Sequence, residues 1–267
     1  IIEAASNTLI SGCKNTLIPD GVTSIGIGAF AGCTNLSSII IPSSVTTIAS
    51  NAFQDCTNLS SITIPNNITS VCYYAFGGKA WYDNLPDGMV YIGKVAYNYK
   101  GAMPANTNII LKEGTLGIAD GAFSDRSGLI SITIPNSITN IGNYAFQGCS
   151  GLTSVTIPNS VTSIGVATFY DCSGLTSVTI SNSVTSIGET AFKNCSGLTS
   201  LDIPSTVTSI GNSAFSGCTG LTEINCYIES PYGIDNGVFS SSTYNSALLR
   251  VPVGTLADRK SGSAGMP

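Results

Sequence analysis

Apolar and polar positions alternate over short stretches of this chain, and the alternating stretches return at a fixed interval. In residues 151–165, which read GLTSVTIPNSVTSIG, the apolar residues Val155 and Ile157 alternate with the polar residues Ser154 and Thr156. This period of two is typical of a half-buried strand. Pro158 has no N–H to donate to a ladder, so we expect the strand to end there.

The second half of the same stretch predicts a different element. In SVTSIG, Val161 and Ile164 are expected to point inward from a short extended segment, and Gly165 is expected to turn the chain. The following pattern, xxAFxxC, predicts a compact helical or 3₁₀ turn that leads to the next strand.

The unit then repeats almost verbatim. Residues 174–188 differ from residues 151–165 at one position, 23 residues later. Copies of one short unit predict a solenoid, since a single coil cannot bury its own apolar side but stacked coils can. We expect about ten coils with like side chains in columns. The Phe column comprises Phe30, Phe53, Phe76, Phe123, Phe146, Phe169, Phe192, Phe215 and Phe239.

The repeat also resembles a known family. The L-x-x-I-x-I-P core, the SIGxxAFxxC stretch and the 23-residue step are similar to the BspA-like (Treponema-type) leucine-rich repeats over roughly residues 15–225. This resemblance implies a mostly β, right-handed leucine-rich repeat solenoid with short helical or 3₁₀ turns. It also implies a bacterial cell-surface or secreted protein that takes part in adhesion and binds host proteins.

The repeat is interrupted between the third and fourth Phe of the column. The segment MVYIGKVAYNY, within residues 77–110, predicts an inserted β-hairpin around Gly93. We therefore expect four parts. They are a starter unit with a first repeat block (1–76), an aromatic hairpin insert (77–110), a second repeat block (111–225), and a C-terminal cap and tail (226–267).

Composition narrows the possible functions. Only 9% of the residues are charged, the net charge is −5, and histidine is absent. Scattered cations argue against nucleic acid as a partner, and no apolar run reaches the length of a membrane span. The lack of histidine removes the commonest general base and zinc ligand. We expect no enzyme activity, no cofactor and no metal.

Cysteines and carboxylates are the remaining candidates for chemistry. Most cysteines lie three residues after a column Phe, one per coil, which favours a column of buried thiols over a metal site or a disulfide ladder. Asp202 and Glu223 lie on adjacent coils, so the spacing allows a carboxylate pair. Ordinary solvated charges are the alternative that we favour.

The outward strand positions predict a broad face lined with hydroxyl groups. It is either a docking surface for protein or glycan, or a set of residues that simply suit exposed strands. Aromatic residues of the insert are a second candidate, because such residues are common at binding hot spots, although they can also cover the gap in the columns. The candidate binding surface comprises Thr153, Thr156, Thr176, Thr179, Thr199, Asp202, Glu223, Trp81, Tyr82, Tyr91 and Tyr97.

The residue pattern predicts a non-enzymatic binding module, and the family resemblance implies a location on the bacterial cell surface or outside the cell. Its partner would be a protein, such as a host extracellular-matrix protein, or a glycan. Two alternatives stay open: a structural spacer in a larger surface protein, and a glycan-binding or accessory module of a secreted hydrolase.

Overall fold

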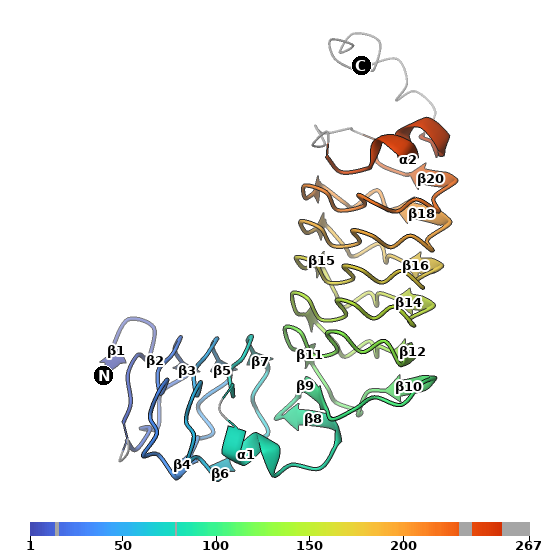
Figure 1. The fold of residues 1–267 in the computed structure, drawn as a ribbon. Helices are drawn as coiled ribbons and strands as arrows, with labels where there is room; N and C mark the ends of the chain where they lie inside the picture. Colours follow the sequence, from blue (N-terminus) through green and yellow to red (C-terminus); the bar gives the residue numbers. More distant parts are fainter. Residues whose placement is uncertain (14–15, 78, 230–236, 253–267) are drawn as a thin grey trace. The chain divides into compact units, whose positions relative to one another are not determined.

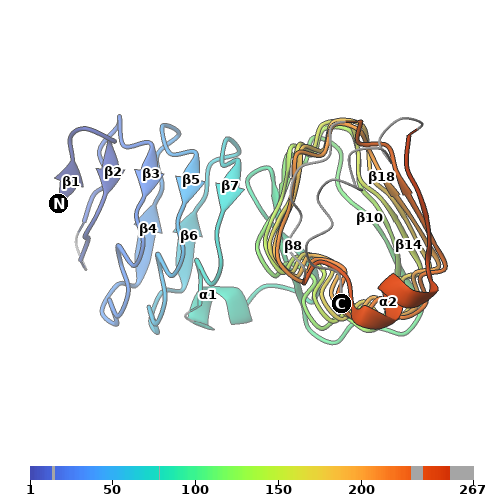
Figure 2. The ribbon, with the colours of Figure 1, turned by 90° about the horizontal axis from the view of Figure 1, so that it is seen from above.

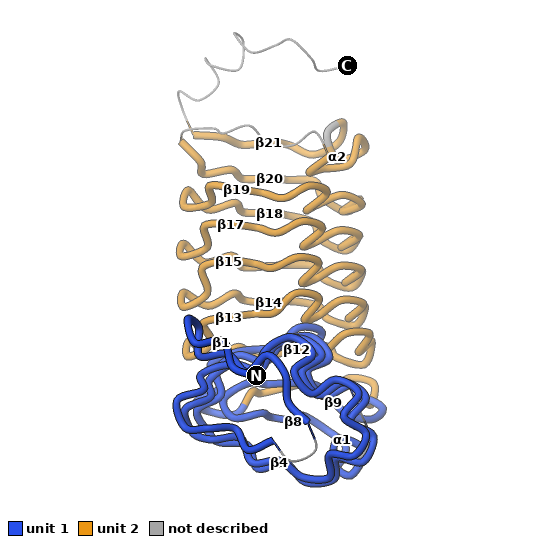
Figure 3. Tube along the Cα trace, turned by 90° about the vertical axis from the view of Figure 1, so that its left-hand side faces the viewer, with its two compact units in different colours: residues 1–103, 112–122 blue, residues 104–111, 123–267 orange. Residues whose placement is uncertain are grey.

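The computed structural model describes residues 1–13, 16–77, 79–229 and 237–252. The chain divides into two compact units, which Figure 3 distinguishes by colour. Unit 1 comprises Ile1–Met103 and Lys112–Ala122, and unit 2 comprises Pro104–Leu111 and Phe123–Pro267. The division of the chain into four parts, proposed above from the repeat pattern, remains a prediction.

The chain is a solenoid of short parallel strands with about nine turns, and its repeats are about 23 residues apart. This count is close to the ten coils expected above. In unit 2, successive coils lie on top of one another, and each adds one strand to a parallel ladder (Figure 1).

Unit 1 has a five-stranded sheet in the order β1-β2-β3-β5-β7, a pair β4-β6, and the neighbouring strands β8, β9 and β11. Pairing is parallel except in β1-β2 and in the β8-β9 hairpin, which confirms the predicted insert. The elements are β1 (Ile2–Glu3), β2 (Thr8–Leu9), β3 (Ser24–Ile25), β4 (Ser38–Ile40), β5 (Thr47–Ile48), β6 (Ser61–Thr63), β7 (Ser70–Val71), α1 (Lys79–Asp83), β8 (Gly88–Ile92), β9 (Val95–Lys100) and β11 (Gly117–Ile118).

Unit 2 places the longer strands of its coils on one side and the shorter strands on another. The longer strands form the sheets β10-β12-β14-β16 and β18-β20-β21, of which Figure 2 labels β10, β14 and β18 along one side. The shorter strands form the sheet β15-β17-β19. The elements are β10 (Thr107–Ile110), β12 (Leu129–Thr133), β13 (Asn140–Ile141), β14 (Ser154–Thr156), β15 (Ser163–Ile164), β16 (Ser177–Thr179), β17 (Ser186–Ile187), β18 (Ser200–Ile203), β19 (Ser209–Ile210), β20 (Glu223–Cys226), α2 (Ser241–Ser246) and β21 (Leu248–Arg250).

The predicted inward positions form the core. Val155, Ile157, Val161 and Ile164 are all buried, and the column Phe side chains are buried in every coil. Within each unit, consecutive Phe rings stack with centroids 5.0 to 5.4 Å apart and planes inclined by 3° to 14°. This spacing is close to the distance between neighbouring strands, so the coil repeat sets the ring geometry.

The turn around each column Phe from Phe30 to Phe215 is held by hydrogen bonds of the 3₁₀ type. In one coil the N–H of Gln147 donates to Tyr144 O, and the N–H of Cys149 donates to Phe146 O, at 3.1 Å each. The residue two positions before each column Phe from Phe30 to Phe215 has a positive φ, whether or not it is glycine. Examples are φ values of 50° at Ala167 and 53° at Thr190.

The glycine at the end of SVTSIG allows the backbones of adjacent coils to approach each other closely, and it does not adopt a left-handed backbone conformation. Gly165 and Gly188 are not among the residues with positive φ. A Cβ on Gly188 would lie 2.6 Å from the carbonyl carbon of Gly165 in the preceding coil. The absent side chain therefore lets the two backbones approach, whereas the sequence pattern predicts a glycine that supplies a turn.

Candidate functional site

The outward side chains of the longer strands in unit 2 form a regular surface, which we call the strand face. Strand alternation exposes every second residue, and the parallel register places equivalent residues side by side, as in Ser154↔Ser177 and Thr156↔Thr179. The strand face consists of two files. One contains Ser131, Ser154, Ser177, Ser200, Glu223 and Leu248, and the other contains Thr133, Thr156, Thr179, Asp202, Asn225 and Arg250.

The hydroxyl groups in the middle of the strand face point to solvent without a protein partner in the described part of the chain. Ser154, Thr156, Ser177 and Thr179 are all exposed. Their hydroxyl groups take part in none of the hydrogen bonds formed among the described residues. Each of them can therefore both donate a hydrogen bond to a ligand and accept one from it.

A neighbouring file of threonines behaves differently. The hydroxyl of Thr153 donates to Ile130 O at 3.1 Å, and the hydroxyl of Thr176 donates to Thr153 O at 3.0 Å. Thr199 continues the file, and its carbonyl accepts from the hydroxyl of Thr222 at 3.1 Å. These hydroxyl protons tie one coil to the preceding one, so this file offers a ligand mainly methyl groups and oxygen lone pairs.

The two carboxylates of the candidate surface are engaged by different partners. Asn225 Nδ2 donates to Asp202 Oδ1 at 2.8 Å, and Arg250 Nε lies 2.8 Å from Glu223 Oε1. Both acids lie on one face of one sheet, in β18 and β20, rather than on opposite walls of a cleft. A glycosidase needs two carboxyl groups that flank the scissile bond, so this geometry does not favour the carboxylate-pair interpretation.

Among the predicted aromatic residues, two meet the end of the Phe stack in unit 1. The rings of Trp81 and Tyr97 lie 5.1 Å and 5.7 Å from the ring of Phe76. Tyr97 is buried, and its hydroxyl oxygen accepts a hydrogen bond from the N–H of Phe76 at 3.2 Å. In the regular coils that N–H donates to a main-chain carbonyl, as Phe53 does to Ala75 O. Tyr97 therefore replaces the missing acceptor, and burial raises the pKa of its hydroxyl to about 12.

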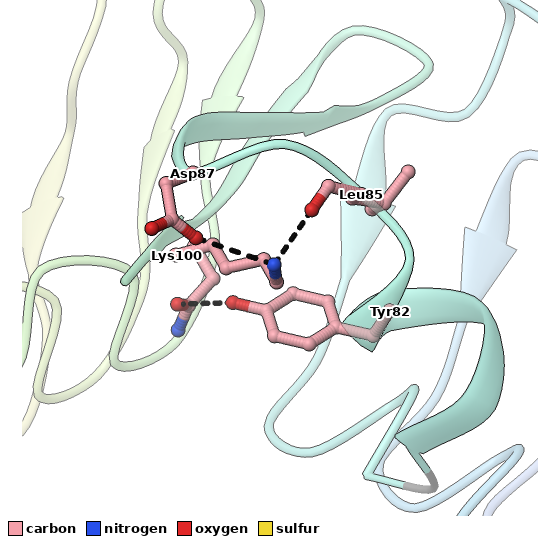
Figure 4. A network of polar contacts seen from close by, with 5 residues as sticks. Tyr82, Leu85, Asp87 and Lys100 are labelled. Atoms are coloured by element: carbon pink, nitrogen blue, oxygen red, sulfur yellow. Dashed lines mark hydrogen bonds and ion pairs between the residues drawn. The ribbon is translucent and has the colours of Figure 1, made fainter. Parts of the chain in front are cut away.

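The other two aromatic residues are held by polar contacts. Tyr91 Oη accepts from the N–H of Lys112 at 2.9 Å, and Tyr82 Oη donates to Asn98 Oδ1 at 2.9 Å. Close to Tyr82, Lys100 Nζ donates to Leu85 O at 2.6 Å and lies 3.3 Å from Asp87 Oδ1 (Figure 4). The contacts of Tyr82 and Lys100 fasten α1 and the segment after it to β9, and the contact of Tyr91 joins β8 to Lys112.

The structure thus separates the sequence candidates into two sets. The strand-face residues and their threonine file lie together on unit 2, whereas Trp81, Tyr82, Tyr91 and Tyr97 belong to unit 1. Asn225 continues the file of Thr179 and Asp202 at the same 23-residue step, as the outward strand pattern indicates. Leu248 and Arg250 also lie on the strand face but were not predicted, because β21 does not follow the 23-residue step and only its pairing reveals them.

The cysteine column is buried and hydrogen-bonded within the stack. Each thiol from Cys149 to Cys218 donates to the carbonyl of the Phe 26 residues earlier, at 3.0 or 3.1 Å. Burial raises the pKa of Cys149 to about 12 and also raises that of Cys172. In the described residues, no three or more Cys, Asp or Glu side chains are grouped so as to hold a metal ion. None of the described helices is long and apolar enough to span a membrane.

Comparisons with known proteins agree with this geometry. The sequence model described as BspA type leucine-rich repeat region matches residues 9–102 and 116–246 in six copies. A search of curated proteins found no match. Among solved structures, a leucine-rich repeat protein of Treponema pallidum is 23% identical with a TM-score of 0.53, and the alignment covers 69% of this chain and 96% of that one.

Two further solved structures resemble the chain more loosely. A leucine-rich repeat protein of Bacteroides ovatus is 23% identical with a TM-score of 0.44, and the alignment covers 88% of this chain but 58% of that one. A leucine-rich cell surface protein of Faecalibacterium prausnitzii is 20% identical with a TM-score of 0.37, covering 100% and 96% of the two chains.

Proposed function

The chain belongs to the BspA-type leucine-rich repeat family, and we propose that it is a non-enzymatic binding module that engages another macromolecule through the strand face of unit 2. The observation that carries the proposal is the set of exposed hydroxyls at Ser154, Thr156, Ser177 and Thr179, which have no partner among the described residues. A surface of unpaired donors and acceptors on a rigid ladder is suited to hydrogen bonding with a partner that covers it.

The arrangement of the potentially reactive groups supports a binding role over catalysis. The column thiols are buried, and burial raises the pKa of Cys172, which disfavours the reactive thiolate. Asp202 and Glu223 are held by Asn225 and Arg250 on an open surface. Neither set brings a nucleophile, a base and an orienting group together, as a catalytic site requires.

Proteins, including proteins of a host extracellular matrix, are the partner class that we propose, with a location on the bacterial surface or outside the cell. Membership in the family supports this proposal, because such repeats resemble those of surface proteins that take part in adhesion. The insert contributes less than the strand face, because Tyr97 is buried and Trp81 is half-buried against Phe76.

Two alternatives make different predictions. A structural spacer would tolerate charges on the strand face with no loss of any interaction of the parent cell. A glycan-binding module would be retained by polysaccharides, and exposed hydroxyls are compatible with that role. If Trp81→Ala abolished the retention of the protein on polysaccharides, the glycan would bind to the insert and not to the strand face.

The test uses a double variant, Thr156→Lys with Thr179→Lys, which places two bulky cations in the middle of the strand face. Thr162→Lys with Thr185→Lys is the matched control, since both threonines are exposed next to the separate strands β15 and β17. We expect binding to a panel of purified matrix proteins, measured by biolayer interferometry, to fall at least tenfold in the first variant and to change little in the control. If the wild type and both double variants bound the matrix proteins equally well, the proposal would be rejected.

A further inference from the structure

The middle of the strand face is nearly the same from one coil to the next. Ser154 and Thr156 on β14 lie in register with Ser177 and Thr179 on β16, and the surrounding fifteen residues differ at one position. A ligand displaced by one coil would therefore meet the same groups at the same spacing. Hydroxyls in this region contribute contact, but they cannot define where along the stack a partner binds.

This regularity ends at β18, β20 and β21. Asp202 replaces threonine in one file, and Glu223 replaces serine in the other. The next strand adds Leu248 opposite Glu223, and Arg250 opposite Asn225. We call Asp202, Glu223, Asn225, Leu248 and Arg250, together with Tyr227 and Glu229, the charged end of the strand face.

Acidic groups outnumber basic ones at the charged end. The guanidinium of Arg250 lies 2.8 Å from Glu223 and neutralises that carboxylate. Asp202 accepts one hydrogen bond from Asn225 through Oδ1, and no described residue donates a hydrogen bond to its Oδ2. Glu229 is exposed without an ion-pair partner in the described chain. The charged end therefore keeps two carboxylates that attract a cation from outside.

The charged end also has a depression and exposed apolar groups. An open cavity of about 510 Å³ is lined by Ser205, Asn225, Tyr227, Glu229 and Arg250 among others, whereas Asp202 and Leu248 lie outside its lining. Tyr227 is 52% exposed and Leu248 is 55% exposed. Aromatic residues and arginine are the types that contribute most to binding energy in protein interfaces, particularly where a pocket admits a partner's side chain.

We propose that the charged end sets the register of a protein partner on the strand face. Asp202 and Glu229 attract basic side chains of the partner, and Tyr227 and Leu248 each offer it an exposed apolar contact. This inference rests on the proposed binding role of the strand face and adds the location and chemistry of recognition. An uncharged polysaccharide offers no cation for these carboxylates and would suit the neutral files equally well at every coil.

The test is a random-peptide display library selected on the whole chain. We expect enriched peptides to combine a basic residue with an apolar one, and to bind at least tenfold more weakly to the double variant Asp202→Asn with Glu229→Gln. The control, Glu113→Gln with Glu189→Gln, removes the same charge at exposed positions away from the strand face and should bind the peptides as the wild type does. Thermal melts of each variant establish that its fold is intact.

The results separate this inference from the broader proposal. Peptides or matrix proteins that lose binding with Thr156→Lys and Thr179→Lys but not with Asp202→Asn and Glu229→Gln would overturn the role of the charged end and leave the strand face as the binding surface. Retention of neutral polysaccharides with no dependence on Asp202 would likewise overturn it. Selected peptides that tolerate both double variants would contradict the inference and the proposed function together.

Discussion

The thiol of Cys172 donates a hydrogen bond to the carbonyl oxygen of Phe146, 3.0 Å away in the preceding coil. The same oxygen also accepts from the N–H of Cys149 at 3.1 Å. Because the relation recurs from coil to coil, the cysteine column joins each turn to its neighbour. The thiols therefore act as structural donors within the core.

Removing one of these thiols should destabilise the stack moderately. Cys172→Ala loses a buried hydrogen bond and leaves a small cavity, while Phe146 O keeps its main-chain partner. We expect the free energy of unfolding, measured with urea, to fall by about 1–2 kcal/mol. Ser173→Ala, at the exposed neighbouring position, is the control and should change it by less than about 0.5 kcal/mol. If Cys172→Ala also changed the free energy of unfolding by less than about 0.5 kcal/mol, the thiol would not act as a structural donor in the core.

Alkaline pH should weaken the fold through the same column. Burial raises the pKa of Cys149 from its ordinary value of 9.0 to about 12, so the folded thiol holds its proton where the unfolded one has lost it. Stability is thus unaffected below pH 9 and falls between pH 9 and 12, by at most about 1.4 kcal/mol per pH unit for one thiol. Urea unfolding at pH 8 and 10.5 measures this fall. Cys149→Ser should reduce the fall, and an unchanged pH dependence would refute the assignment.

Truncating one ring of the Phe stack should be more costly. The ring of Phe169 lies 5.2 Å from that of Phe146 and 5.1 Å from that of Phe192, with no exposed surface. We expect Phe169→Ala to lower the free energy of unfolding by about 3–5 kcal/mol. Phe169→Leu keeps most of the buried volume and should cost clearly less. Similar losses in the two variants would mean that packing volume at this position matters little.

The turn before the Phe contains a residue that glycine should improve. Thr190 has a φ of 53°, a conformation that is unfavourable for β-branched side chains and accessible to glycine. We expect Thr190→Gly to raise the free energy of unfolding by about 0.5 kcal/mol, the backbone gain being partly offset by chain entropy. Ser186→Gly, in the extended strand β17, should instead lower it. Destabilisation by both changes would show that the backbone is not strained at Thr190.

Much of the fold is encoded locally and repeated. The alternation around Val155 and Ile157 is enough to predict which side of the strand is buried, because strand geometry has a period of two. The 23-residue step of Phe146 and Phe169 is enough to predict ring stacking, since identical coils bring identical residues together. The strand face with Thr156 and Thr179 follows from the same two facts.

Other features depend on contacts between residues whose relation no repeat reveals. Tyr97 accepts the N–H of Phe76 at the place where the regular columns fail, and β21 brings Arg250 to Glu223 across a segment that does not keep the step. Likewise, only the stacked coordinates show that the hydroxyl of Thr176 is used by the neighbouring coil while that of Thr156 points outward. A periodic pattern identifies which side chains share a column, but the donor or acceptor that each one meets depends on how far apart the backbones of adjacent coils lie.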